Sequence, residues 1–366
     1  MEHDVSLAGS SRPSNNNHVL PFELLGEVFS YISDDPLDLR YAIFVCRPWH
    51  NAIVHCAKLW TNIIIMNPDR SQGDRLPHTV AFIRLCLSRS SGRPLHMHIS
   101  IDGFDPDSLS FLKDIVAKSG ESGALFQRCK SLTWTCSGSE EISFVAQAFT
   151  SASAPALEYL TIDFKSPAAT RCWVHFPLPR LKEVTLRDNT IGFGPRFFHD
   201  DAFATAERLT LITTAWYHSI NFIRRFQSIR ALVLENPWNI FRSTSSNGPV
   251  NPMEFPLLET LAISGFITDG ALNVIRAPAL RKMEVKPAPF GKLHSLGETM
   301  HLARTLECLY FSVKNNGAPA TSWDKVLERF VAEAPVLVSV WVSPWMVEDL
   351  KGREWLTGLL HVSNSI

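Results

Sequence analysis

Few side chains in this sequence stand at spacings that suit catalysis or metal binding. His96 and His98 alternate within an apolar segment, which puts two imidazoles on one face of a strand, as in the first half of some metal sites. No His-x-x-Glu-His or Cys-x-x-Cys segment offers further ligands, so a solvated strand face is the favoured interpretation. His199, Asp200 and Asp201 form a potential acid–base cluster, but such triplets are common in chains of this length.

Sequence signatures of cofactor binding and nucleophilic catalysis are also absent. The sequence has no Gly-x-x-x-x-Gly-Lys, no Gly-x-Gly-x-x-Gly after a strand and no Gly-x-Ser-x-Gly. Cys129 and Cys136 lack the second pair that a zinc site needs, and the seven cysteines are scattered, mostly within apolar segments. We therefore expect buried cysteines and a protein without catalytic residues, metal or cofactor.

Composition sets limits on the class of protein and on its partners. The chain has 366 residues, 45% of them hydrophobic, which is enough for two domains or one elongated domain. A formal net charge of −1 gives no electrostatic reason to expect nucleic acid or an anionic membrane as partner. Residues 1–18 are polar and do not form a signal peptide, and no apolar run is long enough to span a membrane. We expect a cytoplasmic or nuclear protein.

The elements begin with a small helical segment between residues 20 and 60. Apolar residues at helical spacing from Phe22 to Ile32 predict an amphipathic helix, with Pro21 in its first turn. Residues 33–36 interrupt the pattern, and residues 37–45 resume it as a second short helix. Pro48 opens a third helix that carries Trp49. Three helices in so few residues make a marginal core, which favours stabilisation by a partner.

This segment resembles an F-box, the module that docks on the adaptor of cullin-type ubiquitin ligases. The resemblance rests on Leu20-Pro21, Leu24-Leu25, the Val45-Cys46-Arg47-x-Trp49 turn and Leu59-Trp60. It implies a Skp-type adaptor as partner and, through it, a cullin–RING ligase, with Val45 and Trp49 closing the small core. The residues that it implies for adaptor contact are Leu20, Pro21, Leu24, Leu25, Val28 and Ile32. The alternative is that these residues only pack a local three-helix cap.

The rest of the chain repeats one phrase, in which apolar residues stand at the first, fourth and sixth positions. Its nine copies begin at residues 129, 157, 181, 206, 229, 258, 280, 306 and 337, which are 22 to 31 residues apart. Several copies follow a proline, as in Pro179-Arg180-Leu181 and Pro278-Ala279-Leu280. The spacing is close to the period of leucine-rich repeats, and each phrase predicts a short strand with one buried face. Stacking of the copies would form a parallel sheet.

Two observations make the expected solenoid irregular. The return segments vary, because residues 143–151 and 324–334 are helical in pattern whereas residues 241–252 form a polar loop. The Asn or Cys of the usual leucine-rich pattern is nearly absent, with only Asn189 in place. We therefore expect an α/β chain in four parts. Residues 1–18 form a disordered tail, and residues 19–62 form an F-box. Residues 63–101 contain a connecting helix (78–90) and the first strand (95–101), and residues 102–366 form a leucine-rich-repeat-like solenoid with a parallel sheet. An ordinary α/β domain remains the alternative.

The arrangement as a whole resembles the F-box protein families of basidiomycete fungi. It implies a substrate receptor of an SCF-type ligase, with the F-box on the adaptor and the repeats on a client protein. A repeat scaffold without a ligase, or a hydrolase in an α/β domain, is the alternative. The outward positions of the strands form the expected client surface, and its candidate residues are Tyr159, Asp163, Arg187, Glu284, Tyr310 and Trp341. The tail from Trp345 to Trp355 could instead cover Tyr310 and Trp341.

Overall fold

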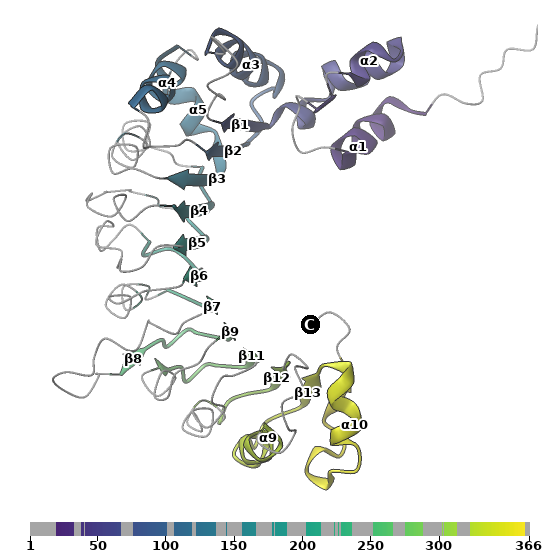
Figure 1. Ribbon diagram of the computed structural model, residues 1–366, viewed down its shortest axis with the longest axis vertical. Coiled ribbons are helices and arrows are strands. Elements are labelled where there is room, and N and C mark those ends of the chain that lie inside the picture. Colours follow the sequence, from purple (N-terminus) through teal and green to yellow (C-terminus); the bar gives the residue numbers. More distant parts are fainter. Residues whose placement is uncertain are drawn as a thin grey trace, which may run out of the picture.

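The computed structural model is an arc of parallel strands with a helical unit at its N-terminal end (Figure 1). The arc is open on one side, and the two ends of the described chain face each other across the opening (Figure 1). The structure describes residues 20–32, 38–39, 41–66, 76–100, 106–118, 122–136, 144, 156–165, 178, 180–188, 203–213, 223, 226, 228–235, 252–265, 275–287, 302, 304–312 and 323–362.

The N-terminal unit contains two α-helices and short 3-10 turns. Its elements are α1 (Phe22–Ile32), η2 (Ala42–Phe44), α2 (Arg47–His55) and η3 (Ala57–Trp60). Pro48 stands in the first turn of α2, as the sequence predicts. The helices α1 and α2 pack closely, since a Cβ on Gly26 would lie 2.9 Å from Cys56 Sγ. The ring of Phe29 meets that of Trp49 edge to face, with centroids 5.2 Å apart.

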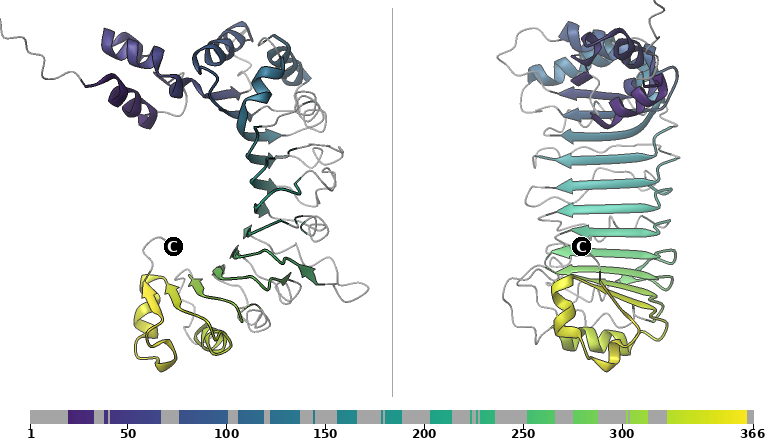
Figure 2. Two further views of the ribbon diagram at one scale, coloured as in Figure 1. Left: turned by 180° about the vertical axis from the view of Figure 1, so that it is seen from behind. Right: turned by 90° about the vertical axis from the view of Figure 1, so that its right-hand side faces the viewer.

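Twelve parallel strands form the main sheet and follow one another in chain order. They are β1 (Asn62–Met66), β2 (Leu95–Ser100), β3 (Cys129–Cys136), β4 (Tyr159–Phe164), β5 (Glu183–Asp188), β6 (Arg208–Thr213), β7 (Ala231–Glu235), β9 (Thr260–Gly265), β11 (Lys282–Pro287), β12 (Cys308–Phe311), β13 (Ser339–Val342) and β14 (Leu360–Val362). Two further strands, β8 (Met253–Glu254) and β10 (Ile275–Arg276), form a separate pair. The main strands line the inner, concave face as successive rungs (Figure 2).

The helices of the repeat region lie on the outer side of the arc. They are α3 (Leu76–Arg89), α4 (Pro106–Lys118), α5 (Ser122–Gln127) and α9 (Trp323–Ala332). The C-terminal end carries η9 (Pro344–Met346), α10 (Val347–Leu350) and η10 (Glu354–Leu356) before β14. Within the part of the chain that the structure describes, every helix is too short or too polar to cross a membrane.

The nine repeated phrases are confirmed as strands of one parallel sheet, and their apolar positions are in register. The fourth position of every phrase lies beside that of the next, from Leu132 on β3 to Val340 on β13. These side chains and those at the sixth position are buried, and together they form the inner layer of a continuous core. The predicted α/β solenoid with a parallel sheet is therefore confirmed.

A tight turn recurs before the strands and explains the start of the phrase. The amide of Leu181 donates to the carbonyl of Leu178, and the same hydrogen bond across three residues joins Leu258 to Phe255 and Leu280 to Ala277. The residue that begins each of these turns is buried as well. The turns thus satisfy backbone groups locally, without the Asn or Cys ladder that the sequence lacks.

A row of charged residues with alternating sign runs along the edge of the sheet where the strands begin. It is made up, in order, of Lys130, Glu158, Lys182, Glu207, Arg230, Glu259, Arg281 and Glu307, and we call it the charge ladder. From Glu158 onward, each backbone amide of the ladder donates to the carbonyl of the residue before it in the row, at 2.7 to 2.9 Å. Ion pairs join Glu158 to Lys182 at 3.0 Å and Arg230 to Glu259 at 2.7 Å. Every charge therefore has neighbours of opposite sign.

The structure differs from the sequence expectations at three places. The strand β1 opens the main sheet, ahead of β2, although the sequence pattern places the first strand at residues 95–101. The strand β14 closes it and has no counterpart among the nine phrases. The second helix expected over residues 37–45 is instead a pair of 3-10 turns. Residues 1–18, 241–251 and nearly all of the helix expected at residues 143–151 lie outside the described residues.

Candidate protein interaction surfaces

The outer face of α1 exposes a stripe of apolar side chains. Leu24, Val28 and Ile32 stand four residues apart and are 51%, 44% and 63% exposed. Leu20, 52% exposed, and the exposed Pro21 extend the stripe beyond the N-terminus of the helix. Large apolar side chains in such a row lose contact with water only when another surface covers them.

The opposite face of α1 packs on the core and includes one residue that was expected on the surface. Leu25 is 5% exposed and Phe29 is 1% exposed. Leu25 therefore does not belong to the exposed set of adaptor candidates, because its side chain is buried in the core of the helical unit. The apolar residues of α1 therefore form two stripes, one exposed and one buried, whereas the sequence predicted a single apolar face.

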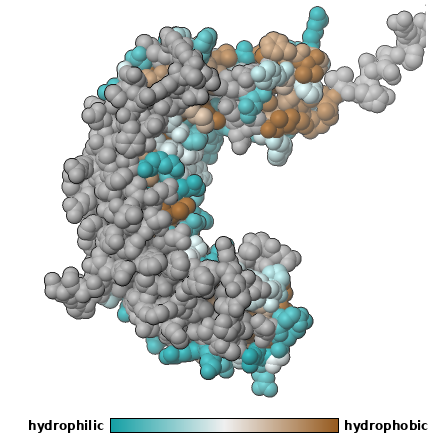
Figure 3. Space-filling model, viewed as in Figure 1, coloured by the Kyte–Doolittle hydropathy of each residue, from teal (hydrophilic) through white to brown (hydrophobic). Residues whose placement is uncertain are grey.

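The turn between α1 and α2 adds further exposed apolar surface. Tyr41 is 69%, Phe44 81% and Val45 62% exposed, so Val45 does not close the small core as expected. Leu39, 2% exposed, is buried in its place. Among the described residues, nine of the fifteen exposed large apolar side chains fall between residues 20 and 45. Hydrophobic side chains gather accordingly over α1 and α2 in the space-filling view (Figure 3).

One ion pair fixes α1 to the turn that leads into the sheet. Lys58 Nζ lies 2.8 Å from Glu27 Oε2, and both side chains are about half exposed. The hydrogen bond from Lys58 holds the pKa of Glu27 below its ordinary value, and the same bond raises the pKa of Lys58. Glu27 is thus engaged within the domain, beside the apolar stripe.

The six client candidates lie on the concave face in two separate groups. Tyr159 and Asp163 on β4 and Arg187 on β5 form the first group, with Asp163 beside Arg187 in the register. Lys165 pairs with Asp163 at 2.8 Å, and Lys130 lies 6.0 Å from the centroid of the Tyr159 ring. The strands β6, β7 and β9 separate this group from the second one.

The second group is a stack of side chains across β11 to β14. Glu284, Tyr310 and Trp341 are neighbours in the register. The rings of Tyr310 and Trp341 are parallel, with centroids 5.7 Å apart, and His361 stacks on the other face of Trp341 at 4.8 Å. Lys282 Nζ covers the free face of Tyr310 at 4.3 Å. The faces of both rings are therefore already in contact with neighbouring side chains.

The C-terminal strand β14, which the sequence did not reveal, supplies the last partner of this stack. The ring of Trp341 stacks on that of His361, with centroids 4.8 Å apart. Leu360 and Val362 occupy the fourth and sixth positions of the repeated phrase. The first position is the polar residue Thr357, so this copy of the phrase is incomplete. Ser343, which follows β13, is buried, and its hydroxyl shares a hydrogen bond of 2.7 Å with that of Ser312.

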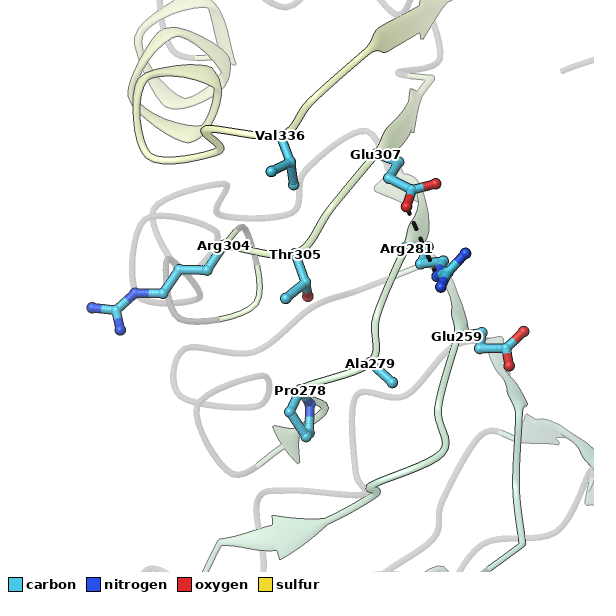
Figure 4. Close-up of a pocket in the computed structure, with 8 residues that line it drawn as sticks. All are labelled: Glu259, Pro278, Ala279, Arg281, Arg304, Thr305, Glu307 and Val336. Atoms are coloured by element: carbon cyan, nitrogen blue, oxygen red, sulfur yellow. Dashed lines mark ion pairs between the residues drawn. The ribbon is translucent and has the colours of Figure 1, made fainter.

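A shallow pocket of about 370 Å³ lies at the edge of β9, β11 and β12, where the charge ladder runs (Figure 4). Glu259, Arg281 and Glu307 line it, and Arg281 Nε lies 3.8 Å from Glu307 Oε1. Arg304 also lines the pocket, and its guanidinium extends away from the three residues of the ladder (Figure 4). Of the four charged side chains that line this pocket, Glu259, Arg281 and Glu307 already form ion pairs along the ladder, and Arg304 is the fourth.

The residues considered first for chemistry are not brought together into a site. His96 is exposed on β2, and His98 lies two residues further along on the same face. Among the described residues, no group of three or more His, Cys, Asp or Glu side chains could hold a metal ion. Burial raises the pKa of the Cys129 thiol. His199, Asp200 and Asp201 lie outside the described residues.

Comparison with known proteins identifies the helical unit. Residues 18–66 match the family model described as F-box-like, so the chain carries an F-box-like domain. The match ends at Met66, the last residue of β1, and so includes the first strand of the sheet. A search of curated proteins found no match. The leucine-rich type of the repeats and the resemblance to basidiomycete families stay predictions.

Proposed function

We propose that this chain, which carries an F-box-like domain, is a substrate receptor of an SCF-type ubiquitin ligase. The F-box-like domain supports a role as adaptor-binding subunit of such ligases in general. The finer proposal is that Leu20, Pro21, Leu24, Val28 and Ile32 contact a Skp-type adaptor while the concave face of the repeats binds a client protein. The observation that carries it is the exposed apolar stripe of α1 within the matched residues.

The mechanism needs no catalytic residue in this chain. The adaptor links the protein to a cullin and a RING subunit, and the receptor holds its client near a charged ubiquitin carrier. Holding both reactants in one assembly turns an encounter between separate molecules into a local one, and this raises the effective concentration of the client's lysines. The cytoplasm and the nucleus are the compartments in which we place this role.

Loss of the apolar stripe should abolish adaptor binding. We expect the triple variant Leu20→Ala, Pro21→Ala and Leu24→Asp to lose capture of a purified Skp-type adaptor, since each buried apolar anchor is worth roughly 1 to 3 kcal/mol. All three side chains are exposed, so circular dichroism and the melting temperature should stay close to those of the wild-type protein.

Leu257→Asp is the matched control, because Leu257 is also exposed, at 45%, but lies far from the F-box-like domain. It should bind the adaptor like the wild-type protein. Undiminished binding by the triple variant would show that the stripe is not the docking surface.

The alternative is a scaffold that binds partners through its repeats without recruiting a ligase. Both functions use the concave face, but only a receptor brings a bound client to the ubiquitin carrier of a ligase. Ligase reconstituted with the wild-type protein or with the triple variant distinguishes the two functions. If the chain is a receptor, the triple variant loses client ubiquitination together with adaptor binding. If the chain is a scaffold, neither protein supports client ubiquitination.

A further inference from the structure

Two charged side chains on the concave face have no partner among the described residues. At outward positions of the described strands of the main sheet, the other charged residues are engaged: Asp163 with Lys165, Glu183 with Arg208, Glu284 with Lys286, and Lys282 with the ring of Tyr310. Arg187 on β5 and Glu235 on β7 make no side-chain hydrogen bond, ion pair or ring contact with any described residue.

The register fixes how these two residues lie relative to each other. Arg187 pairs with Ile212 on β6, and Ile212 pairs with Glu235 on β7. Adjacent strands lie about 4.8 Å apart, so the backbone positions of the two residues are separated by about 10 Å, with an apolar side chain between them. The structure shows no ion pair between the two side chains.

Charge complementarity defines the groups of a partner that would cover Arg187, Ile212 and Glu235. A partner must place a carboxylate over Arg187, an apolar group over Ile212 and a cationic group over Glu235. A nucleic acid fits poorly, because the phosphate backbone is anionic throughout and would meet Glu235, Asp163 and Glu284 on the same face.

The spacing further selects the conformation of that partner. In an α-helix, residues i and i+7 lie on one face and are about 10.5 Å apart, with i+3 and i+4 between them. In an extended strand, about 10 Å corresponds to residues i and i+3, which point to opposite faces and cannot both meet the sheet.

We propose that the concave face binds an amphipathic helix of the client, lying across the strands, with an acidic residue at i, an apolar residue at i+3 or i+4 and a basic residue at i+7. Arg187, Ile212 and Glu235 are the residues that determine this specificity. The inference rests on the proposed client-binding role of the repeats and adds the chemical class of the client segment to it.

The test is selection from a phage library of 16-residue helical peptides randomised at positions i, i+3, i+4 and i+7. The wild-type protein should enrich one acidic and one basic residue at i and i+7, with an apolar residue between them. Arg187→Glu should enrich basic residues at both ends, and Glu235→Arg acidic residues at both ends. A peptide selected by the wild-type protein should bind either variant about 10- to 100-fold more weakly.

Arg304→Glu is the matched control, because Arg304 is an exposed cation on a turn outside the concave face. It should select the same peptides as the wild-type protein. The inference is overturned if no peptide is enriched, if the selected charges are the same for Arg187→Glu, Glu235→Arg and the wild-type protein, or if Arg304→Glu shifts them equally.

Adaptor binding, measured on the same proteins, separates this inference from the proposed function. Arg187→Glu and Glu235→Arg should retain it. If the wild-type protein does not bind the adaptor, the receptor role is overturned, and peptide selection still tests the helix site. If it binds the adaptor but selects no peptide, the helix site alone is overturned.

Discussion

Adjacent residues of the same type have opposite roles in α1. Leu24 is half exposed on the outer stripe, whereas Leu25 is buried against α2. The sequence indicates that both are apolar and helical, but their assignment to two faces depends on where α2 packs. Gly26 permits the close approach of Cys56 that fixes this packing. Tertiary contacts therefore decide which leucine is available to a partner.

The stack of Tyr310 on Trp341 should contribute to stability as a pair. We expect Tyr310→Ala and Trp341→Ala each to lower the free energy of unfolding, with a coupling of about 0.5 to 1.5 kcal/mol between them in a double-mutant cycle. Urea unfolding of the wild-type protein, the two single variants and the double variant gives this value. Tyr310→Ala combined with Tyr159→Ala, whose rings lie on distant strands, is the control and should be additive. Additive losses for the stacked pair would contradict the contact.

The elements of this fold were predictable to different degrees. All nine phrases form strands. Apolar residues at every second position lie on one face of a strand, where they can all be buried together. The strands β1 and β14 were missed, since their phrases merge with the ends of neighbouring helical segments. The client candidates could be placed on the open face by alternation. Glu235 and Ile212 were missed because their importance lies in the lack of a partner and in the pairing register, which the sequence does not show.

Reversal of one charge in the charge ladder should destabilise the strands beside it. Glu259→Arg would place three cations in a row with Arg230 and Arg281, and we expect a loss of about 1 kcal/mol in the free energy of unfolding at low ionic strength. The loss should shrink in 1 M NaCl, where the screening length falls to about 3 Å. Glu259→Gln, which removes the attraction without adding repulsion, should cost less. A loss independent of salt would show that the ladder does not act through its charges.

At the scale of the whole molecule, the F-box-like domain and the repeats share one hydrophobic core. Trp60 joins them: it is 6% exposed, its Nε1 donates to the Ile53 carbonyl at 2.8 Å, and the Arg89 guanidinium covers its ring at 4.7 Å. The buried residues form a continuous cluster from Leu25 in α1 to Leu356 in η10. We therefore expect the orientation of the adaptor-binding surface to be coupled to the first strands of the sheet.

Trp60→Ala should loosen both sides of this junction. We expect a loss of roughly 3 to 5 kcal/mol, as for other buried tryptophans, and faster amide hydrogen exchange in α2 and in β1 together. Trp49→Ala is the control, because Trp49 packs on Phe29 within the helical unit, and its effect should stay in α1 and α2. Faster exchange in α2 alone after Trp60→Ala would show that the two parts are independent.

The alternating signs of the charge ladder also constrain how the array can lengthen or shorten. Removing a single repeat, for example by recombination between copies of the phrase, would bring two residues of like charge together at the new junction. Removing or inserting two consecutive repeats would preserve every contact between opposite charges. A pair of repeats is therefore the unit that this fold can gain or lose without electrostatic cost. This unit is about twice as long as the spacing between successive copies of the hydrophobic phrase.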